Sequence, residues 1–75
     1  MIVREFIDIH NEELKPYYNN PTSFFNLDIY NYKEPYSNII IPMKYLYNKK
    51  IKEVKKSSIV IDDEEITSYS LYLER

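Results

Sequence analysis

The chain of 75 residues contains no glycine, and this absence limits its possible folds and sites more than any other feature. Average usage would place about five glycines in a chain of this length. Glycine provides the backbone of Walker loops, of dinucleotide-binding fingerprints and of type I′ Asn-Gly hairpin turns. The sequence therefore excludes the two nucleotide-binding motifs and that hairpin turn.

The chain also contains no cysteine, which excludes disulfides, zinc–thiolate sites and iron–sulfur clusters. Its length is enough for one small domain with a modest core. The N-terminus carries early charges at Arg4, Glu5 and Asp8, so it lacks the apolar centre of a signal peptide. The longest apolar run, residues 39–41, is far shorter than the ~20 residues of a membrane helix. We expect a single cytoplasmic domain over residues 1–75.

Residues 2–14 have the spacing of a short amphipathic helix. Apolar residues recur every three or four positions, namely Ile2, Val3, Phe6, Ile7 and Leu14. An alternating strand over residues 2–7 is the alternative, because Ile9 interrupts the apolar stripe. Pro16 ends the first element, since the residue before a proline is disfavoured in a helix.

Residues 24–32 have the alternating pattern of a strand. One face is apolar (Phe25, Leu27 and Ile29), and the other begins with Asn26 and Asp28. Residues 38–41 are a candidate second strand.

Pro42 suits the first position of a short helix over residues 42–50, with Met43, Leu46 and Tyr47 facing inward. We expect a change to strand near Lys50.

Residues 57–74 predict a β-hairpin in which strands over 57–61 and 66–74 flank an acidic loop. In the second strand Thr67, Tyr69, Leu71 and Leu73 share one face. The expected fold class is α+β: a three- or four-stranded, mostly antiparallel sheet with one or two short helices on one face.

The acidic loop contains four consecutive carboxylates, Asp62, Asp63, Glu64 and Glu65. They suit a solvated hairpin tip, where like charges discourage edge pairing. They also suit docking on a basic protein surface in imitation of nucleic-acid phosphates. A hard cation is a third possibility, although the EF-hand pattern and its glycine are missing.

Tyrosine is abundant, with nine residues in the chain. A tyrosine provides a large, fairly rigid contact area with a polar tip, which favours protein interfaces. Three tyrosines of the first strand and the following loop are candidate partner-binding residues: Tyr30, Tyr32 and Tyr36.

Residues 44–56 hold six lysines against one glutamate, although the net charge of the whole chain is −2. Lysines interleaved with tyrosines can hold single-stranded nucleic acid through phosphate contacts and base stacking. The candidate residues are Lys44, Tyr45, Tyr47, Lys49, Lys50 and Lys52. A solvated helix end and strand edge would explain the same pattern.

Catalytic constellations are missing from the sequence. His10 is the only histidine, and the serines have no nucleophile elbow. Asp8, Glu12 and Glu13 surround His10 without a recognised metal-ligand spacing. We therefore expect no enzyme activity, no cofactor and no bound metal.

The segments VREFIDI and IPMKYLYNKKIKEV, followed by a closing hairpin, resemble short orphan proteins of phages and integrative elements of AT-rich Gram-positive bacteria. That group includes anti-CRISPR and other anti-defence inhibitors. The resemblance implies a non-catalytic inhibitor that blocks a host nuclease or defence complex by stoichiometric occlusion in the host bacterial cytoplasm. It assigns no role to any single residue. A small single-stranded nucleic-acid-binding accessory protein is the alternative, and a homodimer through an exposed strand edge also remains open.

Overall fold

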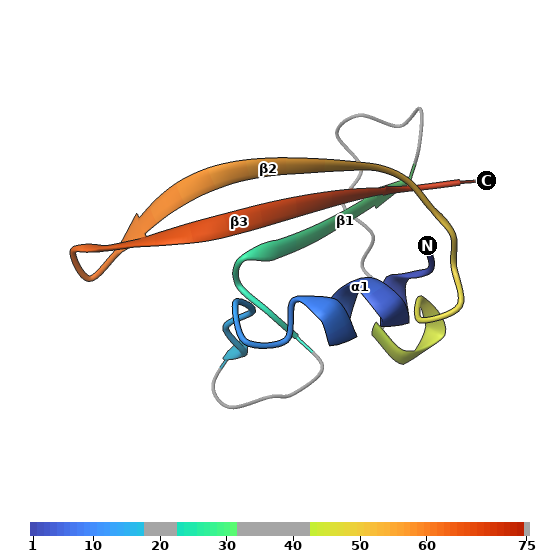
Figure 1. Ribbon diagram of the computed structural model, residues 1–75, viewed down its shortest axis with the longest axis horizontal. Coiled ribbons are helices and arrows are strands. Elements are labelled where there is room, and N and C mark those ends of the chain that lie inside the picture. The colour runs from blue at the N-terminus through green and yellow to red at the C-terminus, as the bar shows by residue number, and fades with distance from the viewer. Residues whose placement is uncertain (18–22, 32–42, 75) are drawn as a thin grey trace.

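The computed structural model describes residues 1–17, 23–31 and 43–74. In chain order these residues form helix α1 (Val3–Ile9), strand β1 (Leu27–Asn31), the short 3₁₀ helix η2 (Met43–Tyr45), and strands β2 (Ile51–Ile61) and β3 (Glu64–Leu73). Helix α1 lies against one face of the sheet, and the β2–β3 hairpin extends beyond it (Figure 1). The expected α+β class is confirmed. The candidate strand over residues 38–41 lies outside the described residues.

Helix α1 forms where the amphipathic pattern predicted it, so the alternative strand over residues 2–7 was wrong. The Glu5 side chain accepts a hydrogen bond from the Ile2 N–H at 3.0 Å, which satisfies one free donor at the helix start. The helix ends at Ile9, earlier than expected, and Ile9 is 64% exposed. A turn over residues 10–13 then returns the chain to the core at Leu14.

The sheet is mixed, which corrects the expectation of a mostly antiparallel sheet. Its order is β1-β3-β2, with β1 parallel to β3 and β2 antiparallel to β3. Asn31 at the end of β1 and Ile51 at the start of β2 are both register partners of Leu73. Because β3 inserts between two strands that run in opposite directions, it must be parallel to one of them. The described residues form three strands and no fourth.

The expected helix over residues 42–50 is wrong beyond η2. The Val3 and Arg4 N–H groups at the start of α1 donate to the carbonyls of Lys49 and Tyr47, both at 3.0 Å. The first N–H groups of a helix have no partner within the helix. Here the carbonyls of Tyr47 and Lys49 accept hydrogen bonds from them, so residues 47–49 do not form a helix of their own. The expected change to strand near Lys50 is confirmed, because β2 begins at Ile51.

The hairpin is confirmed, but its loop is shorter than expected. Only Asp62 and Asp63 lie between the strands, and Glu64 and Glu65 already pair with Ile61 and Val60. Asp62 has a φ of 51° and Asp63 a φ of 63°. Positive φ at both central residues is the pattern of a type I′ turn, which the absence of glycine does not prevent. Aspartate tolerates this region because its short polar side chain can bond locally.

The core lies between α1 and the half of the sheet nearest to it. Its buried residues are Val3, Phe6, Leu14, Leu27, Ile29, Leu46, Tyr69, Leu71 and Leu73. Strand β1 pairs only with residues 69–73 of β3, so residues 64–68 have β2 as their only partner strand within the described chain. Ile66 and Ser68 are nevertheless buried, and Thr67 accepts a hydrogen bond from Asn26. It is therefore the end of the hairpin that projects past the core (Figure 1). None of the helices in the described ranges combines the length and apolar character needed to cross a membrane.

Candidate functional site

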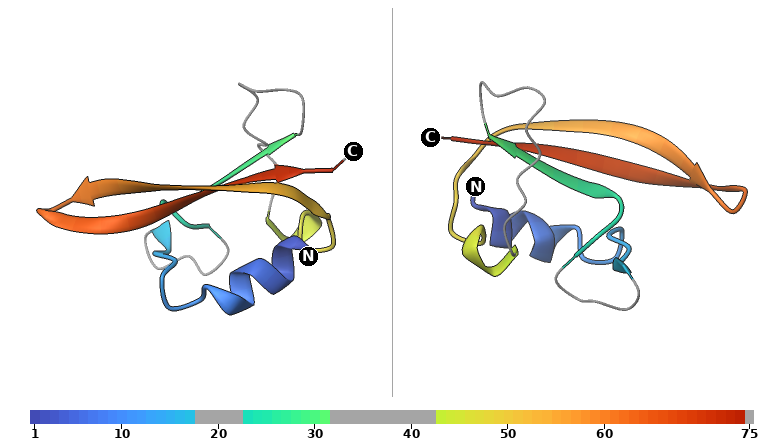
Figure 2. Two further views of the ribbon diagram at one scale, coloured as in Figure 1. Left: turned by 45° about the horizontal axis from the view of Figure 1, so that its top comes forward. Right: turned by 180° about the vertical axis from the view of Figure 1, so that it is seen from behind.

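The four predicted acidic residues gather at the projecting end of the hairpin (Figure 1). Asp62 and Asp63 form the turn, and Glu64 and Glu65 begin β3; all four are exposed. None of them forms an ion pair with another described residue. We call this group, residues 62–65, the acidic tip. A view from behind shows the same projection beyond the helix (Figure 2).

Strand β2 is an edge strand whose exposure the sequence did not reveal. It has β3 on one side, and no described strand pairs with its other side. Every residue from 52 to 58 is exposed, as is Val60. Two of these exposed residues are apolar: the exposed fraction is 43% for Val54 and 72% for Val60. Unpaired edges of this length are templates for pairing with another chain.

Tyr30 lies on β1 and is half-buried. Its ring stacks on Tyr72 with centroids 5.3 Å apart, because the two residues are register partners on β1 and β3. The Lys55 Nζ lies 5.1 Å from the centre of the Tyr72 ring, which continues the row onto β2. Burial raises the pKa of Tyr30, and the Asp28 carboxylate adds to this effect. Sequence reasoning missed Tyr72 and Lys55; Tyr32 and Tyr36 lie outside the described residues.

The predicted nucleic-acid residues lie on η2, on the turn that follows it and on β2. The Lys44 Nζ lies 5.1 Å from the centre of the Tyr45 ring, and the Arg4 guanidinium lies 5.5 Å from that of Tyr47. Both tyrosine rings are thus already paired with cations of this chain. Lys49 and Lys50 join this turn to the N-terminus through backbone contacts, whereas Lys52 lies on β2.

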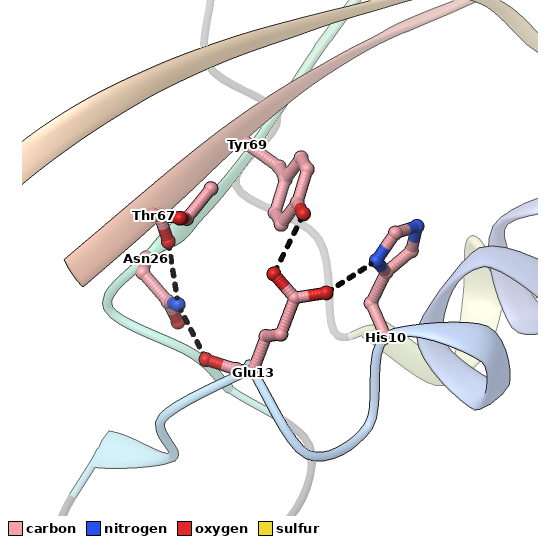
Figure 3. Close-up of polar contacts among 5 residues, drawn as sticks. All are labelled: His10, Glu13, Asn26, Thr67 and Tyr69. Atoms are coloured by element: carbon pink, nitrogen blue, oxygen red, sulfur yellow. Dashed lines mark hydrogen bonds and ion pairs between the residues drawn. The ribbon is translucent and has the colours of Figure 1, made fainter.

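A polar cluster that the sequence did not predict joins the turn after α1 to strand β3 (Figure 3). The His10 Nδ1 lies 2.9 Å from Glu13 Oε1, and the Tyr69 hydroxyl donates to Glu13 Oε2 at 2.8 Å. The rings of His10 and Tyr69 are 4.8 Å apart, and Phe6 packs against both. His10 and Glu13 lie three residues apart and were noted together in the sequence, but Tyr69 comes from a distant part of the chain, so no local motif could have revealed its contact with them.

Asn26 lies next to this cluster and bonds to the backbone of Glu13 and Thr67 (Figure 3). Its side chain donates to the carbonyls of Glu13 at 2.8 Å and Thr67 at 2.9 Å, and accepts from the Lys15 N–H at 2.8 Å. Asn26 is fully buried, whereas we expected it on the polar face of a strand. The correction arises because β1 begins only at Leu27, which leaves Asn26 in a turn. From there its side chain bonds to three backbone groups on two segments of the chain.

The pKa of Glu13 lies below its ordinary value of 4.5, because its carboxylate accepts side-chain hydrogen bonds from His10 and then from Tyr69. A lowered pKa in the folded state stabilises the fold above pH 4.5, and this stabilisation is lost as the pH falls through the lower value. We therefore expect the difference in free energy of unfolding between the wild type and Glu13→Gln to shrink with acidification. Urea titrations over a pH series measure it.

The matched control for that experiment is Glu12→Gln, which removes the neighbouring exposed carboxylate. The difference in free energy of unfolding between Glu12→Gln and the wild type should change less with pH than the difference for Glu13→Gln. Equal pH dependence of the two variants would show that the contacts of Glu13 with His10 and Tyr69 contribute nothing specific.

The polar cluster has a structural role. A hollow of about 290 Å³ beside it is lined by residues 8–13. Among the described residues, no three or more His, Asp or Glu side chains lie close enough together to hold a metal ion. The cluster holds the turn after α1 against β3.

Comparison with protein-family models, curated proteins and solved structures gives no match to this chain. The projecting hairpin, with its acidic tip and its unpaired β2 edge, is therefore assigned as the candidate site from its own geometry.

Proposed function

We propose that this chain is a non-catalytic protein-binding module that docks its acidic tip on a basic site of another protein. The observation that carries the proposal is the projection of the β2–β3 hairpin beyond the core, with four exposed carboxylates at its end. A projecting hairpin can enter a concave site that the rest of the domain cannot reach. The carboxylates would steer the approach electrostatically and give fast, salt-sensitive association.

The proposed partner is a nuclease or another defence protein that holds nucleic acid in a basic channel. Four carboxylates on a narrow hairpin carry the charge sign of a phosphate backbone, so one bound copy would occlude such a channel. The resemblance to anti-defence proteins of phages and integrative elements suggests this inhibitory use. The alternative partner is single-stranded nucleic acid bound through the lysine-rich segment over residues 44–56.

The test is a tip variant that carries Asp62→Asn, Asp63→Asn, Glu64→Gln and Glu65→Gln. Asparagine favours positive φ, so the turn should still form. The wild type and the variant are each used to capture proteins from the lysate of an AT-rich Gram-positive bacterium, and candidate nucleases are then titrated in purified form. We expect the wild type to bind one nuclease and to displace its nucleic acid, and the tip variant to bind at least about tenfold more weakly.

The matched control changes the net charge equally at four exposed carboxylates away from the tip: Asp8→Asn, Glu12→Gln, Glu53→Gln and Glu74→Gln. It should keep most of the affinity. If both variants weaken binding equally, net charge and not the tip determines it. Retention of oligonucleotide by the purified chain, lost as salt rises, would favour the alternative partner.

A further inference from the structure

We propose that the free edge of β2 binds an extended, acidic segment of another protein as an additional antiparallel strand. The site is the long side of the hairpin over residues 53–60, whereas the acidic tip lies at its end. The proposal goes beyond the proposed docking function and does not depend on it, because the two surfaces consist of different residues.

The beginning of this edge already accepts an extended segment of the chain itself. Ile2 forms an antiparallel bridge with Lys50, and the Ile51 N–H donates to the Met1 carbonyl at 2.9 Å. Beyond Ile51 no described strand pairs with this side of β2. The N–H and C=O groups of a strand edge are satisfied by water or by the backbone of another extended chain. A segment antiparallel to β2 would continue the pairing that Met1 and Ile2 begin.

The charge of the edge determines the charge of the segment that it binds. Lys55 and Lys56 are both exposed, and as neighbours in a strand they project from opposite faces of β2. Neither forms an ion pair with a described residue, and Glu53 is the only carboxylate of residues 53–60. Carboxylates on both faces of an added strand would therefore lie opposite a cation, and opposite charges across strands attract.

Two valines on either side of these lysines define the apolar positions of the segment. Val54 is the register partner of Leu71, and Lys56 that of Tyr69. Both partners are buried in the core beside α1, so alternate residues from Val54 to Val60 share the α1 side of β2. Val54 and Val60 are the most exposed apolar side chains of the strand. Aliphatic side chains opposite both valines, with a carboxylate opposite Lys56 between them, would cover this row.

The probe is the synthetic peptide Val-Thr-Thr-Thr-Glu-Glu-Val, acetylated at its N-terminus and amidated at its C-terminus. Antiparallel to β2, it places its valines opposite Val60 and Val54 and its glutamates opposite Lys56 and Lys55. Its threonines lie toward the acidic tip, which would repel carboxylates. Titration into the isotope-labelled chain should shift the NMR amide signals of residues 53–60 most. Replacing both glutamates of the peptide with lysine should weaken binding by about tenfold or more.

A charge exchange on the chain tests the pairing directly. A variant with Lys55→Glu and Lys56→Glu should bind the glutamate peptide about tenfold more weakly, and should bind the lysine peptide more tightly than the wild type does. The matched control carries Lys44→Glu and Lys49→Glu, which make the same charge change at exposed residues before β2. It should still prefer the glutamate peptide, and circular dichroism checks that both variants are folded.

Two further peptides, N-methylated at one or the other set of alternate residues, test for strand pairing. Methyl groups on the side that faces β2 should abolish binding, whereas those on the opposite side should leave it intact. The proposal is overturned if millimolar peptide leaves the signals of residues 53–60 unchanged, if both methylated peptides bind alike, or if the charge exchange does not reverse the preference. An oligonucleotide or a second copy of the chain that occupies this edge in place of the peptide would also overturn it.

The neutral tip variant distinguishes this proposal from the docking function. It should bind the glutamate peptide at least as tightly as the wild type, because the peptide contacts residues 53–60 and not the acidic tip. Weaker peptide binding by the tip variant would contradict the placement of the segment on the edge.

Discussion

Replacing Asn26 with alanine is expected to lower the free energy of unfolding by about 3 kcal/mol or more. The substitution would leave one part-buried N–H donor and two part-buried carbonyl acceptors without their partner, at Lys15, Glu13 and Thr67. Each unsatisfied buried group costs about 1–3 kcal/mol. The free energy of unfolding of a domain of this size is only about 5–10 kcal/mol in total, so the variant should lose a large part of it and unfold at a much lower urea concentration. Urea titration followed by circular dichroism measures the loss.

Two further variants make this prediction specific. Asn26→Asp preserves the shape of the side chain but removes the amide donor to Glu13 and Thr67, so it should also destabilise strongly. Asn11→Ala removes an exposed asparagine from the turn after α1 and should change the free energy of unfolding by less than about 0.5 kcal/mol. If Asn26→Ala were as mild as Asn11→Ala, the three hydrogen bonds would not be what joins this turn to the sheet.

Replacing Leu71 with alanine is expected to lower the free energy of unfolding by about 2–5 kcal/mol. Leu71 has no exposed surface and lies on the central strand, with Ile29 and Val54 as its register partners on either side. Removing its isobutyl group loses apolar burial and leaves a cavity that strands on both sides prevent from closing. The midpoint of urea unfolding should fall while its slope stays the same.

The control for Leu71 is Ile9→Ala, which shortens an exposed apolar side chain by a similar amount. It should change stability by no more than about 0.5 kcal/mol. A loss at Leu71 no greater than that at Ile9 would contradict the position of Leu71 in the core.

The apolar periodicity of the sequence predicted the elements that are defined by local burial. It placed Val3 and Phe6 on the inner face of α1, and Tyr69, Leu71 and Leu73 on one face of β3. These predictions succeed because the side-chain period of a helix or strand follows from backbone geometry alone. The acidic residues were likewise expected at the hairpin tip, where they lie.

The predictions for Asn26 and for the helix after Pro42 were wrong for the same reason. In both cases a segment far away in the chain supplies the hydrogen-bond partner that determines the conformation. Asn26 is buried because the backbone of Glu13 and Thr67 meets it there. The candidate helix after Pro42 is replaced because the start of α1 takes the carbonyls of Tyr47 and Lys49. Neither contact leaves a trace in local sequence pattern, since hydrogen-bond partners far apart in the chain meet only after folding.

Local patterns of periodicity and charge were sufficient to predict the α+β class, the inner faces of α1 and β3, and the acidic end of the hairpin. The position of β3 between β1 and β2 could be known only from the folded domain. That order makes the sheet mixed and leaves β2 as an edge with Val54 and Val60 exposed. Strand order depends on which hydrogen-bonding edges meet across long chain separations, and that choice is made by the packing of the whole domain.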